Sequence, residues 1–443
     1  MIDILLLGAT GYTGRLIARY LASHPQRSAF TFGLAARSES KLRTLVHEYS
    51  PSFTDVPIFV VDVENSTEID QVVQQARVVI NAVGPYSRWG TPVVRACVRH
   101  GRHYVDLTGE APWVKDMIFE FDYVATKAGS VIVPCAALDS IPSDILVYFA
   151  NKVLKEFAGP STNIDISTSA WDIRGAGISG GTFSSILLHL EDIALEKVEA
   201  ASKDFALSPI RGTPSPRPRV FYSLPISKPP VQGALYLMSI INLQVVQRSW
   251  GLFELARRSP RVAFGPACSQ DGEQQNISQQ SYGPDFKYEE FLALPSRLHS
   301  FLVVLFLATV AFALKVFPFA RYLARKLMPQ PGEGPTEQQL QEGSVNITNV
   351  TTSRPDSEGR TINVRTTFLG KGDGYLLSSV MISESAIALV LDRASLPPFA
   401  KRGGVLTPMT AFGDVLIERL KACGRISIES EVLVADSQGR KRR

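Results

Sequence analysis

The sequence has little cysteine and little net charge, and each shortage excludes a class of protein. Four cysteines among 443 residues stand far apart, so neither a disulfide framework nor a metal-ligand spacing is present, and a reducing intracellular compartment is expected. They are Cys97, Cys135, Cys268 and Cys423. The net charge is only +4 and no basic patch is interleaved with aromatic residues, which excludes a nucleic-acid-binding protein. No signal peptide is expected either, because the first apolar run is better explained as a strand.

The composition otherwise describes a folded chain of two or three domains. Hydrophobic residues make up 45% and charged residues 20%, which is typical of globular proteins rather than disordered ones. A chain of this length can bury an ample core.

The first fourteen residues carry the clearest pattern. A run over residues 2–7 that is apolar except for Asp3 ends at Gly8, and Gly11 and Gly14 follow as a periodic helical segment begins. Strand, glycine turn and helix form the framework that binds a dinucleotide pyrophosphate at the helix N-terminus. The spacing is GxxGxxG, with Thr10 where the standard fingerprint has its middle glycine. We therefore expect Gly8, Thr10, Gly11 and Gly14 to contact a nucleotide; an ordinary strand-to-helix turn is the alternative.

The ends of the next two predicted strands indicate which nucleotide binds. A strand over residues 30–36 ends at Arg37, about twenty residues past the glycines, where NAD-binding sites place an acidic residue and an arginine accommodates a 2′-phosphate. Arg37 therefore predicts NADP, with Ser38 as a helix cap and second phosphate donor. A third strand over 58–61 is followed by Asp62, which lies either beside the adenine or as a strand-end cap.

A fourth strand, over residues 78–82, leads towards the expected nicotinamide end. Parallel strands present their carboxyl ends to the ligand, so Asn81, Gly84, Pro85 and Tyr86 should line the cleft. Two more short strands are expected at 105–107 and 131–134. Six strands alternating with helices predict an N-terminal Rossmann domain, an α/β doubly wound parallel sheet.

A run of motifs along the chain resembles one known family. The motifs are VINAVGPYSRWGTPVVRACVRHGRHYVDLTGE (79–110), LDSIPSD (138–144), SGGT (179–182), VVQRSWGL (245–252), PGEGPT (331–336), GDGY (372–375) and GGVLTP (403–408). Together they resemble the saccharopine dehydrogenase-like oxidoreductases and the related trans-acting enoyl reductases. The resemblance implies an NADP-dependent oxidoreductase with a second, α+β domain and a link to lipid or glycolipid metabolism. Ala137 and Leu138 depart from the Gly-Phe usual in this family, which affects the expected shape of the pocket.

Reduction of a double bond also requires a proton donor near the nicotinamide. Tyr86, Asp139 and Ser140 are the catalytic candidates, and Asp106 and Glu110 lie on neighbouring loops. For Tyr86 the alternative is an aromatic ring packed over the cofactor. No metal site is expected.

The segment 301–314 is the most unusual stretch, because Thr309 is its only polar residue. Fourteen helical residues span about 21 Å, less than the roughly 30 Å of a bilayer core, so a simple membrane span is not favoured. The alternatives are a buried core or dimer helix and an apolar anchor in one leaflet or on a lipid droplet, followed by cations that meet acidic headgroups. The apolar character on every side, and a second apolar patch over 235–246, favour the lipid surface.

The predicted organisation is an NADP-binding Rossmann domain (1–150), an α+β substrate and dimerisation domain (151–298 and 335–443) and an apolar membrane-associating segment with its linker (299–334). The predicted function is reduction by NADPH of an unsaturated lipid or acyl substrate at the cytoplasmic face of a membrane or at a lipid droplet, with a homodimer left open. The alternatives are a non-catalytic lipid-surface scaffold or redox sensor, and an amino-acid imine dehydrogenase whose carboxylates would be bound by Arg174 and Arg211.

Overall fold

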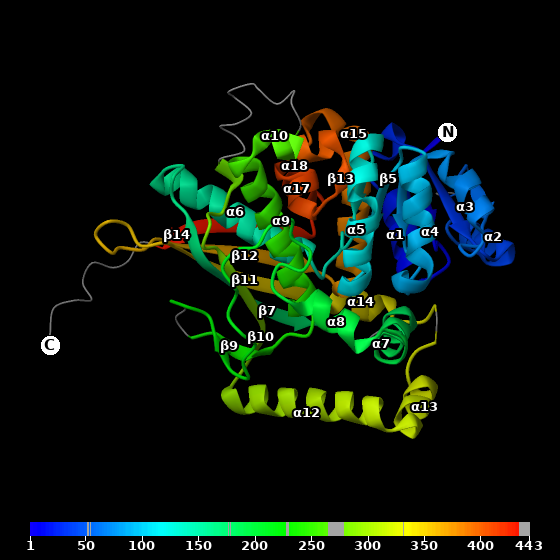
Figure 1. The fold of residues 1–443 in the computed structure, drawn as a ribbon. Coiled ribbons are helices and arrows are strands. Elements are labelled where there is room, and N and C mark those ends of the chain that lie inside the picture. The colour runs from blue at the N-terminus through cyan, green and yellow to red at the C-terminus, as the bar shows by residue number, and fades with distance from the viewer. Residues whose placement is uncertain are drawn as a thin grey trace.

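The computed structural model describes residues 1–443 except 51, 52, 54, 176, 178, 227–229, 265–278, 331 and 434–443, so Cys268 and Pro331 lie outside it. The described residues form two sheets of seven strands each, which lie beside one another (Figure 1). The first contains β1 (Ile2–Leu7), β2 (Phe32–Ala36), β3 (Ile58–Val60), β4 (Ala76–Asn81), β5 (His103–Asp106), β6 (Val131–Val133) and β13 (Gly404–Val405). The second contains β7 (Ile164–Arg174), β8 (Tyr222–Ser223), β9 (Gln232–Leu235), β10 (Lys287–Leu294), β11 (Ser344–Ser353), β12 (Asn363–Lys371) and β14 (Ile426–Leu433).

Helices connect and cover these strands. In the N-terminal third they are α1 (Tyr12–Ala22), α2 (Glu39–Glu48), α3 (Ser66–Val73), α4 (Tyr86–Arg99), α5 (Ala111–Ala128) and α6 (Ile141–Ala158). Next come α7 (Gly180–Asp192), α8 (Leu195–Ser202), α9 (Ser239–Arg258), α10 (Pro260–Phe264), α12 (Arg297–Val316) and α13 (Pro318–Leu327). The last are α14 (Glu337–Glu342), α15 (Gly374–Leu391), α16 (Pro398–Arg402), α17 (Pro408–Phe412) and α18 (Asp414–Ala422), with short 3₁₀ turns η1 (Arg27–Ala29) and η2 (Arg393–Ser395).

The first sheet is parallel throughout and has the order β13-β6-β5-β4-β1-β2-β3. Strand β1 lies between β4 and β2 with helices on both faces, which explains the unbroken apolar run from Ile4 to Leu7. Ile4 and Leu6 pack with α1 and α15 on one face, whereas Leu5 and Leu7 pack with α3, α4 and α5 on the other. The order from β3 to β6 is that of a dinucleotide-binding sheet, so the predicted doubly wound Rossmann fold is confirmed.

The C-terminal third contributes to this N-terminal sheet. Strand β13 pairs with β6 through Gly404 opposite Val131, and α15 packs against α1, β4 and β5. The predicted division assigned all of 335–443 to the second domain, and the structure differs in these two elements. Since the pairing joins residues more than 270 positions apart, no local pattern could have revealed it.

The second sheet is mixed, with the order β14-β12-β11-β7-β10-β9-β8, in which only β7 and β10 run parallel. Helices α6 and α9 pack on one of its faces. A layer of polar side chains is buried there, and Asn349 Nδ2 donates to Ser167 Oγ at 2.7 Å and to Ser169 Oγ at 3.0 Å. Because these groups are bonded to one another, their burial leaves few polar atoms without a partner.

Helices α7 and α8 are separated by extended backbone at Ile193 and Ala194. One local prediction differs from the structure. The apolar patch expected over 235–246 is mostly interior, because α9 buries Ile241, Val245 and Val246 against the body of the protein. Only Leu237 and Ile240 of that stretch are largely exposed.

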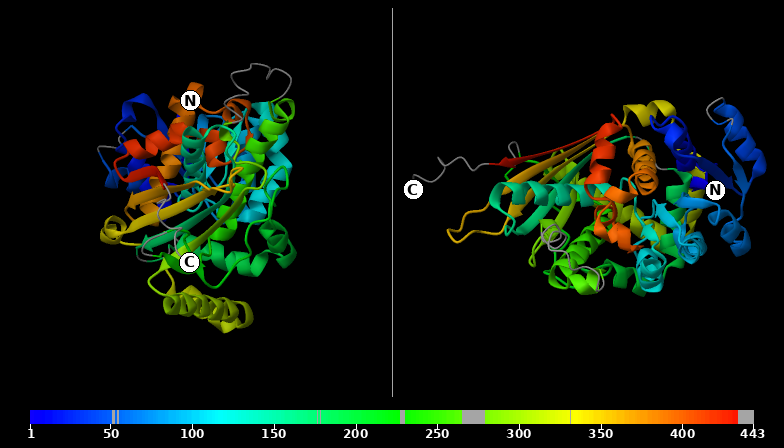
Figure 2. Two further views of the ribbon diagram at one scale, coloured as in Figure 1. Left: turned by 90° about the vertical axis from the view of Figure 1, so that its left-hand side faces the viewer. Right: turned by 90° about the horizontal axis from the view of Figure 1, so that it is seen from above.

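The apolar segment forms α12, which is followed at once by α13. The 20 residues of α12 exceed the predicted fourteen, and Ser300 is its one buried residue. The helix lies across the edge of the molecule beneath β9 and β10 (Figure 1), and the left-hand view of Figure 2 shows this yellow-green pair standing apart from the body. Of the two helices among the described residues that are long and apolar enough to cross a membrane, α15 is mostly buried. The apolar character of α15 is therefore that of a core helix.

Candidate active site

The glycine turn joins β1 to α1 at the carboxyl edge of the first sheet, with Thr10 half-buried within it. Gly8 has a φ of +81°, in the left-handed region that favours glycine, and a Cβ there would lie 2.9 Å from the Ala82 carbonyl oxygen. A Cβ at Gly14 would lie 2.1 Å from the Gly8 carbonyl oxygen, so only glycine permits this approach of helix to strand. Among the described residues, no side chain caps the first N–H groups of α1, whose N-cap is Gly11. This cradle fits a pyrophosphate.

Arg37 follows β2 and is exposed, with no ion pair to any residue that the structure describes. Its guanidinium is therefore free to meet a 2′-phosphate. Ser38 caps α2 and accepts a hydrogen bond from Lys41 N at 3.3 Å, so its hydroxyl is already engaged with the helix. The order of strands puts Arg37 one strand away from the glycine turn, as a bound dinucleotide requires.

The residues after β3 and at the end of β4 shape the turns around them. Asp62 Oδ1 accepts a hydrogen bond from Glu64 N at 3.1 Å, which is the behaviour of a strand-end cap; its contact with the adenine stays a prediction. Asn81 is fully buried. Its Oδ1 accepts from Val83 N at 3.0 Å and its Nδ2 donates to the Tyr104 hydroxyl at 3.2 Å. Asn81 therefore holds the loop that leads to the nicotinamide end.

That loop continues through Gly84 and Pro85 into α4. The Glu110 carboxylate accepts hydrogen bonds from Tyr86 N at 2.7 Å and from Ser87 N at 2.9 Å, and so caps this helix. The Tyr86 side chain is buried, and its hydroxyl donates to the Asn81 carbonyl oxygen at 2.9 Å. Burial raises the pKa of Tyr86. This placement argues against Tyr86 as the proton donor and favours the packing alternative, and it makes Glu110 a structural cap.

The remaining candidates lie between β6 and α6. Ser140 is fully buried and its hydroxyl donates to Asn242 Oδ1 at 3.1 Å. Asp139, next to it, is half-buried, and no described residue forms a hydrogen bond with its carboxyl group. Burial raises the pKa of Asp139 to about 6. Of the three predicted catalytic residues, Asp139 therefore has the side chain that is most available to a substrate.

Asp139 and the glycine turn belong to one continuous edge of the sheet. Asp106, at the end of β5, accepts from Cys135 N at 2.9 Å, and the Tyr86 hydroxyl accepts from Leu107 N at 3.4 Å. Burial raises the pKa of Asp106 to about 7, but its oxygens are held by backbone groups and by the Tyr104 hydroxyl. Asp106 therefore joins the loops rather than facing a ligand.

Sequence analysis did not identify the buried network behind Ser140. Asn242 Nδ2 donates to Glu290 Oε1 at 2.7 Å. Three further donors meet Glu290 Oε2: the hydroxyl of Tyr288 at 2.6 Å, that of Ser143 at 2.7 Å and the indole N–H of Trp171 at 3.0 Å. Glu290 is preceded by Glu289 in β10, so the sequence did not show which of the two carboxylates is buried and must be bonded.

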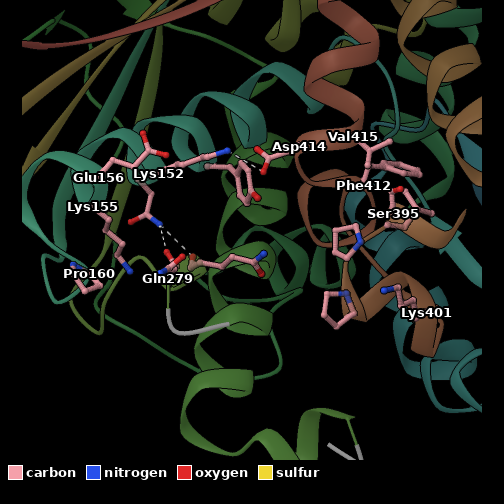
Figure 3. A pocket seen from close by; sticks show the side chains of 16 residues that line it. Lys152, Lys155, Glu156, Pro160, Gln279, Ser395, Lys401, Phe412, Asp414 and Val415 are labelled. Carbon is pink, nitrogen blue, oxygen red and sulfur yellow. Dashed lines mark hydrogen bonds and ion pairs between the residues drawn. The ribbon is translucent and has the colours of Figure 1, made fainter. Parts of the chain in front are cut away.

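A pocket of about 460 Å³ lies elsewhere, between α6 and the segment from η2 to α18 (Figure 3). Lys152 and Lys155 of α6 line it, and Lys152 is paired with Asp414 at 3.0 Å. Its lining contains none of the predicted site residues. This pocket is therefore separate from the glycine turn.

Comparison with known proteins identifies the family of the N-terminal domain and relatives of the whole chain. The family model described as the saccharopine dehydrogenase NADP-binding domain matches residues 4–133. The whole chain is 30% identical to a candidate trans-acting enoyl reductase of Mycobacterium tuberculosis, covering 98% of each protein. The chain belongs to the family of the trans-acting enoyl reductases. The trans-acting enoyl reductase of Mycobacterium bovis is a further relative, 28% identical over 95% of this chain and 96% of its own length.

This member of the trans-acting enoyl reductase family resembles saccharopine dehydrogenase in its fold. The structure of the apo enzyme from Saccharomyces cerevisiae, described as L-Glu forming, matches 98% of this chain and 100% of its own, with a TM-score of 0.52 and 14% identity. This likeness concerns the fold. Together with the NADP-binding domain, family membership identifies the protein as an NADP-dependent oxidoreductase.

Replacing Arg37 with glutamine is expected to weaken NADPH binding at least about tenfold while the affinity for NADH changes less than about twofold. Hydrogen bonds to a charged group are worth roughly 1.5–3 kcal/mol, equivalent to about 10- to 150-fold in affinity. Fluorescence titration of each nucleotide measures this. Arg95→Gln is the matched control, because Arg95 is an exposed arginine of α4 that is paired with Glu120 of α5. Equal weakening of both nucleotides would contradict the assignment of Arg37 to the 2′-phosphate.

Proposed function

We propose that the protein reduces the carbon–carbon double bond of a lipid-like or acyl substrate, with NADPH as the reductant, at the surface of a membrane or lipid droplet. The observation that carries this proposal is the end-to-end match with relatives named as trans-acting enoyl reductases. A role in lipid or glycolipid metabolism follows as part of the proposal.

The chemistry needs a hydride and a proton. Bound NADPH supplies the hydride to one alkene carbon, and the electron pair of the double bond moves to the other carbon, which takes up a proton. In this chain the glycine turn and Arg37 hold the nucleotide, and Asp139 holds the proton to be donated. Its partly desolvated carboxyl group favours the protonated form, as a general acid requires. Ser140 and Asn242 position the turn that carries Asp139.

The exposed apolar surface of α12 and α13 supports the lipid setting. Twenty helical residues reach about 30 Å, so length alone would permit a span. However, α12 lies against β9 and β10 along the edge of the body (Figure 1), which suits a helix lying in the plane of the surface. Phe306 and Phe312 are 66% and 60% exposed, and the Arg325 and Lys326 cations of α13 would meet acidic headgroups.

The two arginines considered for an amino-acid substrate do not support that alternative. Arg174 is exposed at the end of β7 and pairs with Asp172 of the same strand at 3.2 Å, and Arg211 is exposed. A bidentate carboxylate site is usually built from arginines held in a cleft.

The test is reduction of trans-2-enoyl thioesters of increasing chain length by the purified protein with NADPH and lipid vesicles. The expected result is nucleotide oxidation matched by a product that has gained two hydrogen atoms, with the rate rising with chain length. Reduction only of a keto acid in the presence of an amino acid would instead establish the imine dehydrogenase alternative. NADPH binding without turnover of either substrate class would favour the scaffold or redox sensor.

A further inference from the structure

The segment 332–336, which we call the strap, lies on the first turns of the nucleotide-binding helix. The Tyr12 hydroxyl donates to the Pro335 carbonyl oxygen at 2.6 Å, and Arg15 Nη2 donates to the Gly332 carbonyl oxygen at 2.7 Å. A Cβ at Gly334 would lie 2.7 Å from the Tyr12 ring, so the backbone of the strap is seated directly on that ring. The strap therefore packs on the start of α1 beside the glycine turn and stabilises it.

The strap also joins α1 to the start of two other helices. Gly180 N of α7 donates to the Glu333 carbonyl oxygen at 3.1 Å. Ser179 N donates to the Tyr375 hydroxyl at 2.7 Å, and the Tyr375 ring packs edge-on against Tyr12 with 5.3 Å between centroids. The N-termini of α1, α7 and α15 thus meet around the strap. The strap packs here only when these N-termini are in place, and its contacts in turn hold them there.

The other end of the strap leads to the apolar helices. Helix α13 ends at Leu327, a few residues before Gly332, and follows α12 directly. Packing of α12 on the body is confined mainly to β9 and β10, and α13 contains no buried residue. Few contacts therefore hold these two helices to the body of the protein, and they precede the strap directly in the chain.

We propose that a lipid surface bound by α12 and α13 and NADP(H) bound at the glycine turn are coupled through the strap, so that each tightens the binding of the other. This rests on the proposed function, which places α12 and α13 at a lipid surface. Immersion of the two helices fixes the start of the strap and so reduces the entropy lost when the strap docks. The docked strap holds the first turn of α1, where the pyrophosphate binds.

The experiment measures both affinities in both states. NADPH is titrated by fluorescence with and without vesicles of equal parts phosphatidylcholine and phosphatidylglycerol, and co-flotation with the same vesicles is measured with and without NADPH. Both dissociation constants are expected to fall by the same factor, about fivefold or more, because coupling between two sites is reciprocal. The full-length protein is used throughout.

Gly334→Ala is the variant that separates the two sites. Its methyl group would lie 2.7 Å from the Tyr12 ring, so the strap and the ring must move apart, whereas the residues of α12 and the glycine turn are not altered. NADPH affinity is expected to lose its dependence on vesicles, the coupling factor falling to about one. Gly181→Ala is the matched control, since a Cβ there meets its nearest neighbour at an ordinary 3.8 Å, and it should keep the wild-type factor. If Gly334→Ala does not fold, Tyr12→Phe replaces it, because that change removes only the bond to Pro335 and should reduce the factor.

The outcomes distinguish the two proposals. Flotation with an NADPH affinity that does not respond to vesicles would overturn the coupling and leave the proposed function standing. Absence of flotation under every condition would overturn the lipid-surface part of the proposed function, and the coupling with it. A wild-type coupling factor in folded Gly334→Ala would show that the strap is not the connection.

Discussion

Replacing Asp139 with asparagine is expected to lower kcat for double-bond reduction at least about a hundredfold, within the range that a general acid contributes. The variant keeps the size of the side chain and removes its acidic proton. Because Asp139 has no hydrogen bond to a described residue, the exchange breaks no internal contact, and NADPH affinity should change less than about threefold. Steady-state kinetics and a nucleotide titration on the same preparation measure the two effects separately.

The pH dependence of kcat provides a second test of the Asp139 carboxyl group. Burial raises the pKa of Asp139 to about 6, and only the protonated carboxyl can donate. In the wild type, kcat is therefore constant below about pH 6 and falls as pH rises above it. The residual kcat of Asp139→Asn should not show this fall with rising pH. Asp116→Asn is the control, as Asp116 is an exposed carboxylate of α5 paired with Lys197. An Asp139→Asn variant with wild-type kcat and pH profile would eliminate Asp139 as the acid.

Replacing Glu290 with alanine is expected to lower the free energy of unfolding by about 3–5 kcal/mol, the largest stability effect we anticipate. Each donor left without an acceptor in the interior costs about 1–3 kcal/mol, and Glu290 accepts from four side chains on β7, β10, α6 and α9. Some of this cost is relieved when hydroxyl groups rotate to other partners. Urea denaturation, followed by far-UV circular dichroism, measures the loss.

Two further variants show that the loss comes from the network. Glu290→Gln keeps an oxygen for some of the donors and should lose roughly half as much stability as the alanine variant. Glu431→Ala removes a carboxylate from β14 of the same sheet, but its partner Arg365 is exposed, so the change should be within about 0.5 kcal/mol. A Glu290→Ala variant as stable as Glu431→Ala would mean that the network contributes little.

The parts of the fold that the sequence predicted are those with a local cause. Residues 4–7 are apolar on both faces because helices cover both sides of β1, and six strands in order follow from the same pattern. Helix α15 was also predictable, since most of its residues are apolar. Its partner was not: helical periodicity carries no information that α15 would pack on α1, a helix from the other end of the chain.

The candidate site divides in the same way. Gly8 and Arg37 could be named as candidates from their positions after strands, because backbone freedom and charge are properties of the residue itself, and their contacts with the nucleotide stay predictions. Tyr86 could not, since its role depends on where the hydroxyl points, and that is decided by the Asn81 carbonyl oxygen and by the capping of α4 by Glu110. Asn242 belongs to a helix of the second half, and only the tertiary structure brings it to Ser140.

The pairing of β13 with β6 also determines when a growing chain can finish its nucleotide-binding half. During synthesis the first six strands leave the ribosome early, but β13 and α15 follow more than two hundred residues later. Until then no segment of the chain covers the outer edge of β6 or the apolar surface on which α15 packs. Such surfaces are prone to aggregate, so biosynthesis of this protein should depend on chaperones that hold the N-terminal half through most of translation.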